Sequence, residues 1–304
     1  MISTLMWFRY DLRVNNNDAL INASFNSKCL PIFILDTEFL NLETTSEFHL
    51  SFLTDSLEEL SKNLEKYGGK LNIYKGKTIE ILKMLIQNHS IKAVFSNKIF
   101  KNTFHTNLDK NIKLFLRSLD VSWTQTNQFG IQLNHRERGK WSLHWKKFMS
   151  KPIKKDLIKT KFINDKNSII SYPLIKSKNK VQKGGENIAL ELLESFLKER
   201  HFNYSRKMSS PISAELSCSR LSPHLAFGTI SMHKIVNALN QRLKSYEDHD
   251  KSSLNSFKKR LAWHCHFIQK LYDEPEIEFR NMNSAYNGIR ENDFNEDYHL
   301  AWKN

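Results

Sequence analysis

The chain has 304 residues, 40% of them hydrophobic, and this length is sufficient for about two domains with buried cores. Its apolar runs are far shorter than the roughly 20 residues of a membrane span, and charged side chains follow the N-terminus too soon for a secretory signal. Three widely spaced cysteines (Cys29, Cys218 and Cys265) form no CxxC pair. This spacing argues against a disulfide framework or a zinc ribbon and favours a cytoplasmic protein. From the short apolar runs we expect no membrane partner.

Charge is the first positive indication of function. Lysine and arginine total 46 against 32 acidic residues, which gives a net charge of +14. An excess of this size predicts attraction to nucleic acid, because cationic side chains release the counterions of the phosphate backbone. The alternative is a genome rich in A and T that favours lysine codons, and the abundance of asparagine and lysine agrees with it.

The first part of the chain alternates strand and helix patterns. Short apolar runs predict strands at 3–8, 30–35, 71–76, 92–97 and 121–126, and helical periodicity covers 48–69, 78–89 and 107–119. Gly68 and Gly69 mark the end of the first of these helices, and Thr78 is a candidate cap for the second. We therefore expect residues 1–130 to form a doubly wound parallel sheet that binds ligands beyond the carboxyl ends of its strands. Neither a GxGxxG nor a Walker loop is present, which argues against the usual dinucleotide and nucleoside triphosphate sites.

The rest of the chain differs in pattern. Residues 131–185 are rich in lysine and poor in periodicity, so we interpret them as a basic connection between domains. From 186 the periodicity is helical, over 186–202, 230–246 and 253–272. We expect no strand after residue 130, so the domain at 186–304 is predicted to be all-helical.

The segment 217–231, SCSRLSPHLAFGTIS, is rich in small hydroxyl side chains. Ser219 and Ser222 lie where a loop enters a helix that Pro223 could start. A helix N-terminus with hydroxyl donors is suited to a phosphate group. The alternative is that one of the two serines only caps the helix.

Four segments together resemble the photolyase/cryptochrome family of blue-light flavoproteins. They are WFRYDLRVNNNDAL at 7–20, CSRLSPHLAFGTIS at 218–231, RLAWHCHFIQKL at 260–271 and FNEDYHLAWKN at 294–304. They lie in the family's order over nearly the whole chain. Asn16 replaces an aspartate of the family pattern, and Cys218 replaces a threonine, which removes one hydroxyl donor.

The resemblance implies that the helical domain binds FAD and that the segment at 218–222 holds its diphosphate. It also implies a folate or deazaflavin antenna in the α/β domain and a monomeric protein. The residues that it places at the flavin nucleotide are Tyr204, Cys218, Ser219, Arg220, Leu221 and Ser222.

The activity implied is light-dependent DNA repair, in which an electron from photoexcited reduced FAD splits a cyclobutane pyrimidine dimer. A dimer stacks poorly and can be flipped into a pocket at a low free-energy cost, and a basic rim would gather the phosphates. The resemblance assigns Trp263 and His264 to catalysis. It assigns DNA contacts to Arg206, Lys207, Arg260, Trp263 and Phe267. The alternative for Trp263 is an ordinary core position.

Departures from the family pattern leave a second function as an alternative. Arg260 stands where many dimer-repairing members have glutamate, His264 replaces an arginine, and Cys265 replaces an acid. These changes fit a cryptochrome-like photoreceptor without repair activity. A third interpretation, a nucleotide-binding α/β module with a basic helical appendix, leaves SRLSPHLAFG unexplained. No metal site is expected, because the i, i+2 spacing of His264 and His266 puts them on different helix faces.

The last landmark ends at Asn304, where family members continue into a GxTGxPxVDAxMR-type segment. That segment would complete the flavin cleft and carry most of the tryptophan relay, of which Trp302 is the candidate present here. We therefore expect a chain truncated within the FAD-binding helical domain, with weak or no retention of FAD on its own. If complete, the protein would be a deoxyribodipyrimidine photo-lyase.

Overall fold

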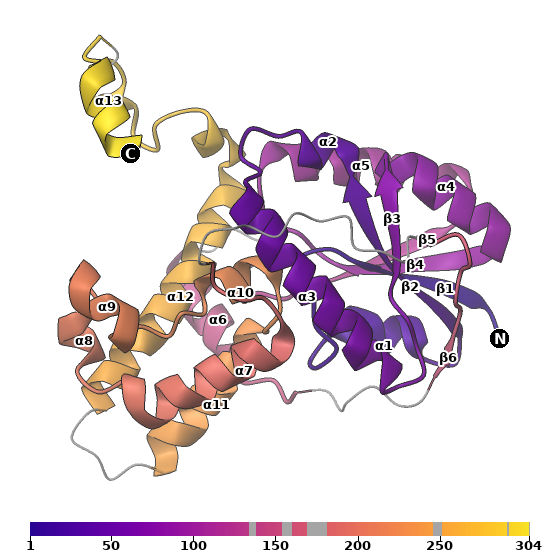
Figure 1. Ribbon diagram of the computed structural model, residues 1–304, viewed down its shortest axis with the longest axis horizontal. Helices are drawn as coiled ribbons and strands as arrows, with labels where there is room; N and C mark the ends of the chain where they lie inside the picture. Colours follow the sequence, from indigo (N-terminus) through magenta and orange to yellow (C-terminus); the bar gives the residue numbers. More distant parts are fainter. Residues whose placement is uncertain (134–137, 154–159, 169–180, 246–250, 291, 304) are drawn as a thin grey trace.

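The computed structural model describes residues 1–133, 138–153, 160–168, 181–245, 251–290 and 292–303. Two parts follow each other along the chain, a parallel α/β domain and a helical domain (Figure 1). The predicted fold class is therefore confirmed. Much of the basic connection predicted at 131–185 lies outside the described residues.

All strands of the sheet are parallel. They are β1 (Ser3–Phe8), β2 (Lys28–Asp36), β3 (Asn72–Gly76), β4 (Ile91–Asn97), β5 (Ser122–Thr126) and β6 (Lys161–Phe162). The order is β3-β2-β1-β4-β5, and β6 pairs with the start of β2. The direction of the winding reverses between β1 and β4, so a crevice is expected outside the carboxyl ends of these two strands.

Helices cover both faces of the sheet. They are α1 (Asp18–Ser24), α2 (Thr37–Leu40), α3 (Glu47–Glu65), α4 (Thr78–His89) and α5 (Thr103–Ser118). Side chains of β1 alternate between two buried clusters: Met6 and Phe8 join the cluster that includes α3, whereas Leu5 and Trp7 join the one with α4 and α5. This alternation explains why the strand is apolar along its whole length.

Two local features of this domain differ from the sequence prediction. Thr78 does not cap α4: the N-cap is Lys77, which makes no side-chain bond to the helix, and Thr78 Oγ1 instead bonds to Asp36. Helix α1 has only seven residues, too few for a periodic signal, and its N-cap is Asn17, whose side chain accepts a bond from Leu20 N at 3.3 Å.

The helical domain packs around a core that includes Phe196, Ile235, Leu239, Leu254 and Phe257. Helix α13 lies away from this core (Figure 1). The α-helices are α6 (Trp141–Met149), α7 (Glu186–Ser195), α8 (Tyr204–Lys207), α9 (Pro211–Ser217), α10 (Ser222–Phe227), α11 (Met232–Ser245), α12 (Lys251–Asp273) and α13 (Glu296–Lys303). The remaining helical segments are the π-helix η2 (Phe196–Arg200) and the 3-10 turns η1 (Arg138–Lys140), η3 (Pro275–Glu278) and η4 (Ser284–Tyr286).

The region predicted as a basic connection contains regular elements. Helix α6 buries Trp145 and Met149 in the core of the helical domain. Strand β6 lies at the sheet, where Phe162 packs against the protein's α/β core. The prediction of no strand after residue 130 is therefore wrong at β6, which is two residues long and shows no alternating pattern.

The two domains meet through backbone groups that follow β1. Glu186, at the start of α7, accepts hydrogen bonds from Val14 N at 2.9 Å and Asn15 N at 3.0 Å. Gly228 ends α10 with φ of 67°, and a Cβ there would lie 2.0 Å from the carbonyl oxygen of Tyr10. Only glycine permits so close an approach. This contact sets the helical domain beside the carboxyl ends of the strands.

Among the residues that the structure describes, no helix is both long and apolar enough to cross a bilayer.

Candidate functional site

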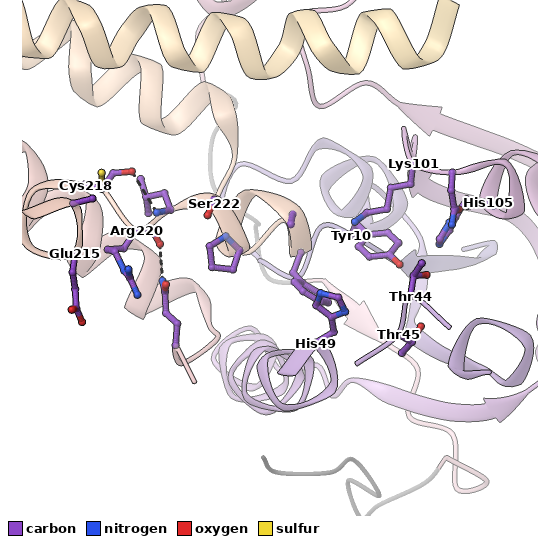
Figure 2. A pocket seen from close by; sticks show the side chains of 18 of the residues that line it. Tyr10, Thr44, Thr45, His49, Lys101, His105, Glu215, Cys218, Arg220 and Ser222 are labelled. Carbon is purple, nitrogen blue, oxygen red and sulfur yellow. Dashed lines mark hydrogen bonds between the residues drawn. The ribbon is translucent and has the colours of Figure 1, made fainter. Parts of the chain in front are cut away.

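A cavity of about 1040 Å³ lies between the two domains (Figure 2). One wall comes from the helical domain, namely α9, the loop after it and α10. The opposite wall comes from the α/β domain, at residues that follow β1, β2 and β4. The lining includes Tyr10, Phe39, Thr44, Thr45, His49, Lys101, Asn102, His105, Gln182, Pro211, Ala214, Glu215, Cys218, Ser219, Arg220, Leu221, Ser222, Pro223, Ala226 and Phe227.

The loop between α9 and α10 brings the predicted diphosphate residues to this cavity. Arg220 takes a left-handed conformation with φ of 61°, which turns the chain into α10. Pro223 lies in the first turn of α10, as predicted. Ser222 begins the helix, is exposed and provides no side-chain cap. The alternative that Ser222 only caps the helix therefore finds no support.

Ser219 has a local role in the same loop. Its hydroxyl accepts a hydrogen bond from Leu221 N at 3.4 Å, which is long for such a bond. The hydroxyl can still donate to a ligand, because accepting this bond leaves its proton available. Both serines thus offer donors on the cavity side of the loop.

Arg200 fixes the conformation of this loop. The sequence analysis did not identify this residue. Its guanidinium donates to the carbonyl oxygens of Cys218 and Ser219, and also to Leu192 O at 2.7 Å. Burial lowers the pKa of Arg200, and the nearby Arg220 lowers it further. Arg200 donates to the carbonyl oxygens of the loop. The backbone N–H groups of the loop are therefore the groups that can donate to an anion. No sequence signal pointed to it, since it lies in a π-helical turn within an amphipathic pattern.

The opposite wall carries a half-buried cation. Lys101 Nζ lies 3.9 Å from the centre of the Tyr10 ring, and burial lowers the pKa of this lysine to about 8. His105 stays neutral, because burial, then Arg9 and Lys101, lower its pKa to about 3. Lys101 follows β4, so the rule that ligands bind beyond the strand ends could have identified it.

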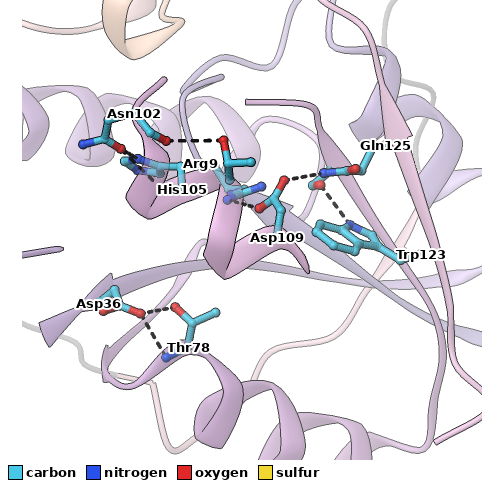
Figure 3. Close-up of polar contacts among 10 residues, drawn as sticks. Arg9, Asp36, Thr78, Asn102, His105, Asp109, Trp123 and Gln125 are labelled. Atoms are coloured by element: carbon cyan, nitrogen blue, oxygen red, sulfur yellow. Dashed lines mark hydrogen bonds and ion pairs between the residues drawn. The ribbon is translucent and has the colours of Figure 1, made fainter. Parts of the chain in front are cut away.

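A small cavity of about 60 Å³ lies behind Tyr10, within the α/β domain. Around it, Arg9 Nη2 binds Asp109 at 2.6 Å, and Asp36 accepts a hydrogen bond from Thr78 N at 3.1 Å (Figure 3). Nη1 of Arg9 is buried and has no partner among the described residues.

The remaining predicted residues lie outside the large cavity. Tyr204 is buried in the helical core, with its ring centre 5.6 Å from that of Phe196, and it does not line the cavity. His264 is half-buried against Phe129, and burial lowers its pKa. The cysteine beside it, Cys265, is fully buried, and burial raises its pKa to about 11.

The predicted DNA residues lie on the surface of two helices of the helical domain. Trp263 and Phe267 of α12 are 56% and 52% exposed, and their ring centres are 5.7 Å apart. Trp263 is therefore not a core residue in this structure. Arg260 is exposed on the same helix, and Arg206 and Lys207 are exposed on α8.

Comparison with known proteins agrees with this architecture. Residues 4–129 match the DNA photolyase family model. Over 98% of its length the chain is 25% identical to a deoxyribodipyrimidine photo-lyase of Agrobacterium fabrum, of which it covers 65%. It is 41% identical to a chloroplastic/mitochondrial cryptochrome DASH of Arabidopsis thaliana, over 31% of this chain and 18% of that protein. The chain thus spans about two thirds of the length of the photo-lyase.

Solved structures share the fold. A bacterial class III photolyase from Agrobacterium tumefaciens superposes with a TM-score of 0.81 at 22% identity, covering 100% of this chain and 65% of that one. A photolyase from Sulfolobus tokodaii, solved with two FAD molecules, gives a TM-score of 0.78 at 24% identity, covering 99% of this chain and 67% of that one. The N-terminal part of the chain thus matches the DNA photolyase family model, and along nearly its whole length the chain is similar to DNA photolyases in sequence and in fold.

Proposed function

We propose that the protein acts in light-dependent DNA repair, splitting cyclobutane pyrimidine dimers with FAD bound at the loop Cys218–Ser222. The observation that carries this proposal is the cavity of about 1040 Å³ into which that loop faces. Its volume is at the upper end of the range for ligand sites, as a dinucleotide requires. Hydroxyl donors and a cation on one wall, with a second cation opposite, match the chemistry of a diphosphate.

The loop of the helical domain and Arg200 behind it hold the cofactor in this proposal. Ser219, Ser222 and the N–H groups of the loop donate to the diphosphate, and Arg220 adds charge. Arg200 fixes the loop by binding its carbonyl groups. Reduced FAD, when bound, supplies the electron for repair, and the protein positions it and excludes water.

The α/β domain is the proposed place of the antenna, a folate or deazaflavin. The resemblance to the photolyase/cryptochrome family is what supports this placement, since the cavity behind Tyr10, of about 60 Å³, is smaller than such a chromophore requires. A second flavin is a further candidate, because the Sulfolobus tokodaii photolyase was solved with two FAD molecules.

DNA would meet the exposed faces of α12 and α8. Trp263 and Phe267 offer adjacent rings on which a flipped lesion can stack. Arg260, Arg206 and Lys207 offer charge for phosphates, in keeping with the net charge of +14.

A blue-light photoreceptor without repair activity is the second candidate. It is favoured by Arg260, an exposed arginine where many dimer-repairing relatives carry glutamate. An arginine donates hydrogen bonds but accepts none, so it would not replace the acceptor that the glutamate offers to the dimer.

A flavin titration tests the cofactor site. We expect FAD to bind the purified protein about tenfold more weakly when Ser219→Ala and Ser222→Ala are combined, because two donors to an anion are lost. Ser209→Ala, at an exposed serine that does not line the cavity, is the matched control. Equal affinity in the double variant and the wild type would contradict the site.

A second experiment separates the two functions. The protein with reduced FAD is illuminated with an oligonucleotide that carries a thymine dimer, and intact thymines are measured. Restored thymines support repair. Bound FAD with no restored thymines supports the photoreceptor.

A further inference from the structure

Three successive peptide carbonyl groups of the loop between α9 and α10 are occupied by side chains from elsewhere in the chain. Arg200 donates to Cys218 O and, at 3.4 Å, to Ser219 O. Gln182 Nε2 donates to Arg220 O at 2.6 Å. Because both donors lie 18 or more residues before the loop, tertiary contacts set the direction in which each of these peptide groups points.

Arg200 is itself held in place by the end of α7. Its Nη2 atom donates to Leu192 O at 2.7 Å, and Ser195 Oγ accepts from Nε at 3.2 Å and from Nη2 at 3.0 Å. The turn from Phe196 to Arg200 is π-helical, and His201 N donates to Phe196 O at 3.0 Å. Such turns are rare and are frequent at functional sites. The guanidinium therefore has a fixed direction that does not depend on a ligand.

The occupied carbonyl groups change what the loop offers to a ligand. A peptide group can present either its N–H or its oxygen, and an oxygen that faced the cavity would repel the oxygens of a phosphate. Gln182 lines the large cavity, so its amide covers an acceptor of the wall. With these oxygens occupied, the loop presents backbone N–H groups and the hydroxyls of Ser219 and Ser222.

The charge of this region also favours an anion. Burial lowers the pKa of Arg200, and Arg220 is close enough to lower it further. An anion bound beside Arg220 would offset the repulsion between the two guanidinium groups. Arg220 lines the cavity, whereas Arg200 does not. Arg200 therefore acts on a ligand through the loop and not by contact.

We propose that Arg200 and Gln182 are positioning residues that make the loop selective for phosphate. By occupying its carbonyl oxygens, they let the loop recognise the diphosphate of a nucleotide and discriminate against the nucleoside. This inference rests on the proposed function, because it concerns the same site. It adds that the selectivity depends on two residues outside the segment Cys218–Ser222.

Calorimetric titration with ADP and adenosine tests the proposal, since ADP carries the adenosine and the two phosphates of FAD. The wild-type protein is expected to bind ADP at least about tenfold more tightly than adenosine. Arg200→Gln should reduce this ratio to about threefold or less and leave the affinity for adenosine unchanged. A residue needed only for folding would weaken both ligands. Arg200→Lys keeps the charge but loses the planar fork, so its ratio should be intermediate.

Gln182→Ala removes a contact near the surface, so it gives the test a second variant if Arg200→Gln does not fold. It should reduce the ratio about two- to threefold, because one hydrogen bond to a loop carbonyl is lost. Lys198→Gln is the matched control: this exposed lysine lies in the same π-turn and does not line the large cavity. It should leave both affinities unchanged. The Tm of each variant reports whether it is folded.

The proposal is overturned if the Arg200 and Gln182 variants keep the wild-type ratio, or if they weaken ADP and adenosine equally. The Ser219→Ala, Ser222→Ala protein separates this failure from a failure of the proposed function. If the serine variant loses affinity for FAD and the other variants keep it, only the present inference is wrong. If none of these variants changes FAD binding, or if the wild type binds neither FAD nor ADP, the proposed cofactor site is wrong as well.

Discussion

Lys101 places its ammonium in the large cavity beside an aromatic ring. Burial is what lowers its pKa from 10.5 to about 8, so the protonated form is disfavoured in the folded protein. The side chains that face it, Tyr10 and Phe227, offer ring electrons and no full negative charge. A desolvated cation of this kind lowers the free energy of unfolding, and an anionic ligand bound beside it would offset that loss.

Replacing this lysine should separate stability from ligand binding. Lys101→Met keeps the length of the side chain and removes the charge, so we expect a higher Tm at pH 7 and weaker FAD binding. The folded protein releases the proton near pH 8 and the unfolded chain near pH 10.5, so the unfolded chain binds more protons between these values. Wild-type stability therefore rises over this window, and the variant's advantage disappears.

Thermal unfolding of both proteins from pH 7 to pH 10.5 measures this difference. Lys98→Met, on a lysine that does not line the cavity, controls for the general loss of a charge. A difference in Tm that stays constant with pH would contradict the assignment.

At this scale, the sequence could indicate which residues of one contiguous motif lie together, whereas their role at a cofactor stays a prediction. Ser219, Arg220 and Ser222 are neighbours in the sequence, so a single pattern places them together at a helix start. Lys101 and Arg200 reach the same site from elements far away in the chain. Their contacts depend on how the domains pack, which no local pattern specifies.

Helix α7 joins the domains through its first residue. Glu186 accepts two backbone N–H bonds from the loop after β1, and Asn63 Nδ2 of α3 lies 3.4 Å from the same carboxylate. Burial raises the pKa of Glu186, while the bonds from the loop counteract it. The carboxylate thus accepts hydrogen bonds from backbone N–H groups that are not paired within a strand or a helix.

Removing this carboxylate should loosen the domain interface. Glu186→Ala leaves the buried N–H group of Val14 without an acceptor and removes the part-buried bond from Asn15 N, so we expect a loss of about 1–3 kcal/mol of unfolding free energy. Urea denaturation measures the loss, and amide exchange at those two residues should accelerate. Glu191→Ala, at an exposed position of the same helix, should change neither. Unchanged exchange at Val14 would contradict the role of Glu186.

Elements were predictable in proportion to their length and periodicity. Helix α4 matches its predicted range of 78–89, because twelve residues carry a clear apolar stripe. Helix α6 was missed, since its apolar residues Trp145 and Met149 are embedded among lysines of a basic region. Strand β6 is held by its pairing with Lys28 and Cys29 rather than by its own pattern. Tertiary contacts decide such short elements.

At the scale of the molecule, the fold has two candidate binding surfaces: the large cavity and the exposed rings of α12. The large cavity is bordered by both domains, whereas the exposed rings of α12 belong to the helical domain alone. The net charge of +14 is a property of the whole chain, and composition revealed it at once. Which face receives DNA depends on the positions of a few aromatic and basic side chains, and those required the family motif or the structure.

DNA binding should therefore separate into a charge component and a lesion component. Arg260→Ala should weaken binding to every sequence and reduce the slope of log K against log salt by about 1, because one phosphate contact is lost. Trp263→Ala should leave that slope unchanged and remove much of the preference for dimer-containing over intact DNA, since stacking contributes about 1–3 kcal/mol per base.

Fluorescence anisotropy at several salt concentrations, with both DNA types, measures the two components. Trp302→Ala is the matched control: this tryptophan is 84% exposed on α13, away from the proposed DNA face, and its loss should alter neither component. If Trp302→Ala reduces the lesion preference as much as Trp263→Ala does, exposed aromatic area in general is responsible, and α12 is not the lesion-binding face. A salt slope changed by Trp263→Ala would likewise show that the ring acts through the position of nearby charges rather than by stacking.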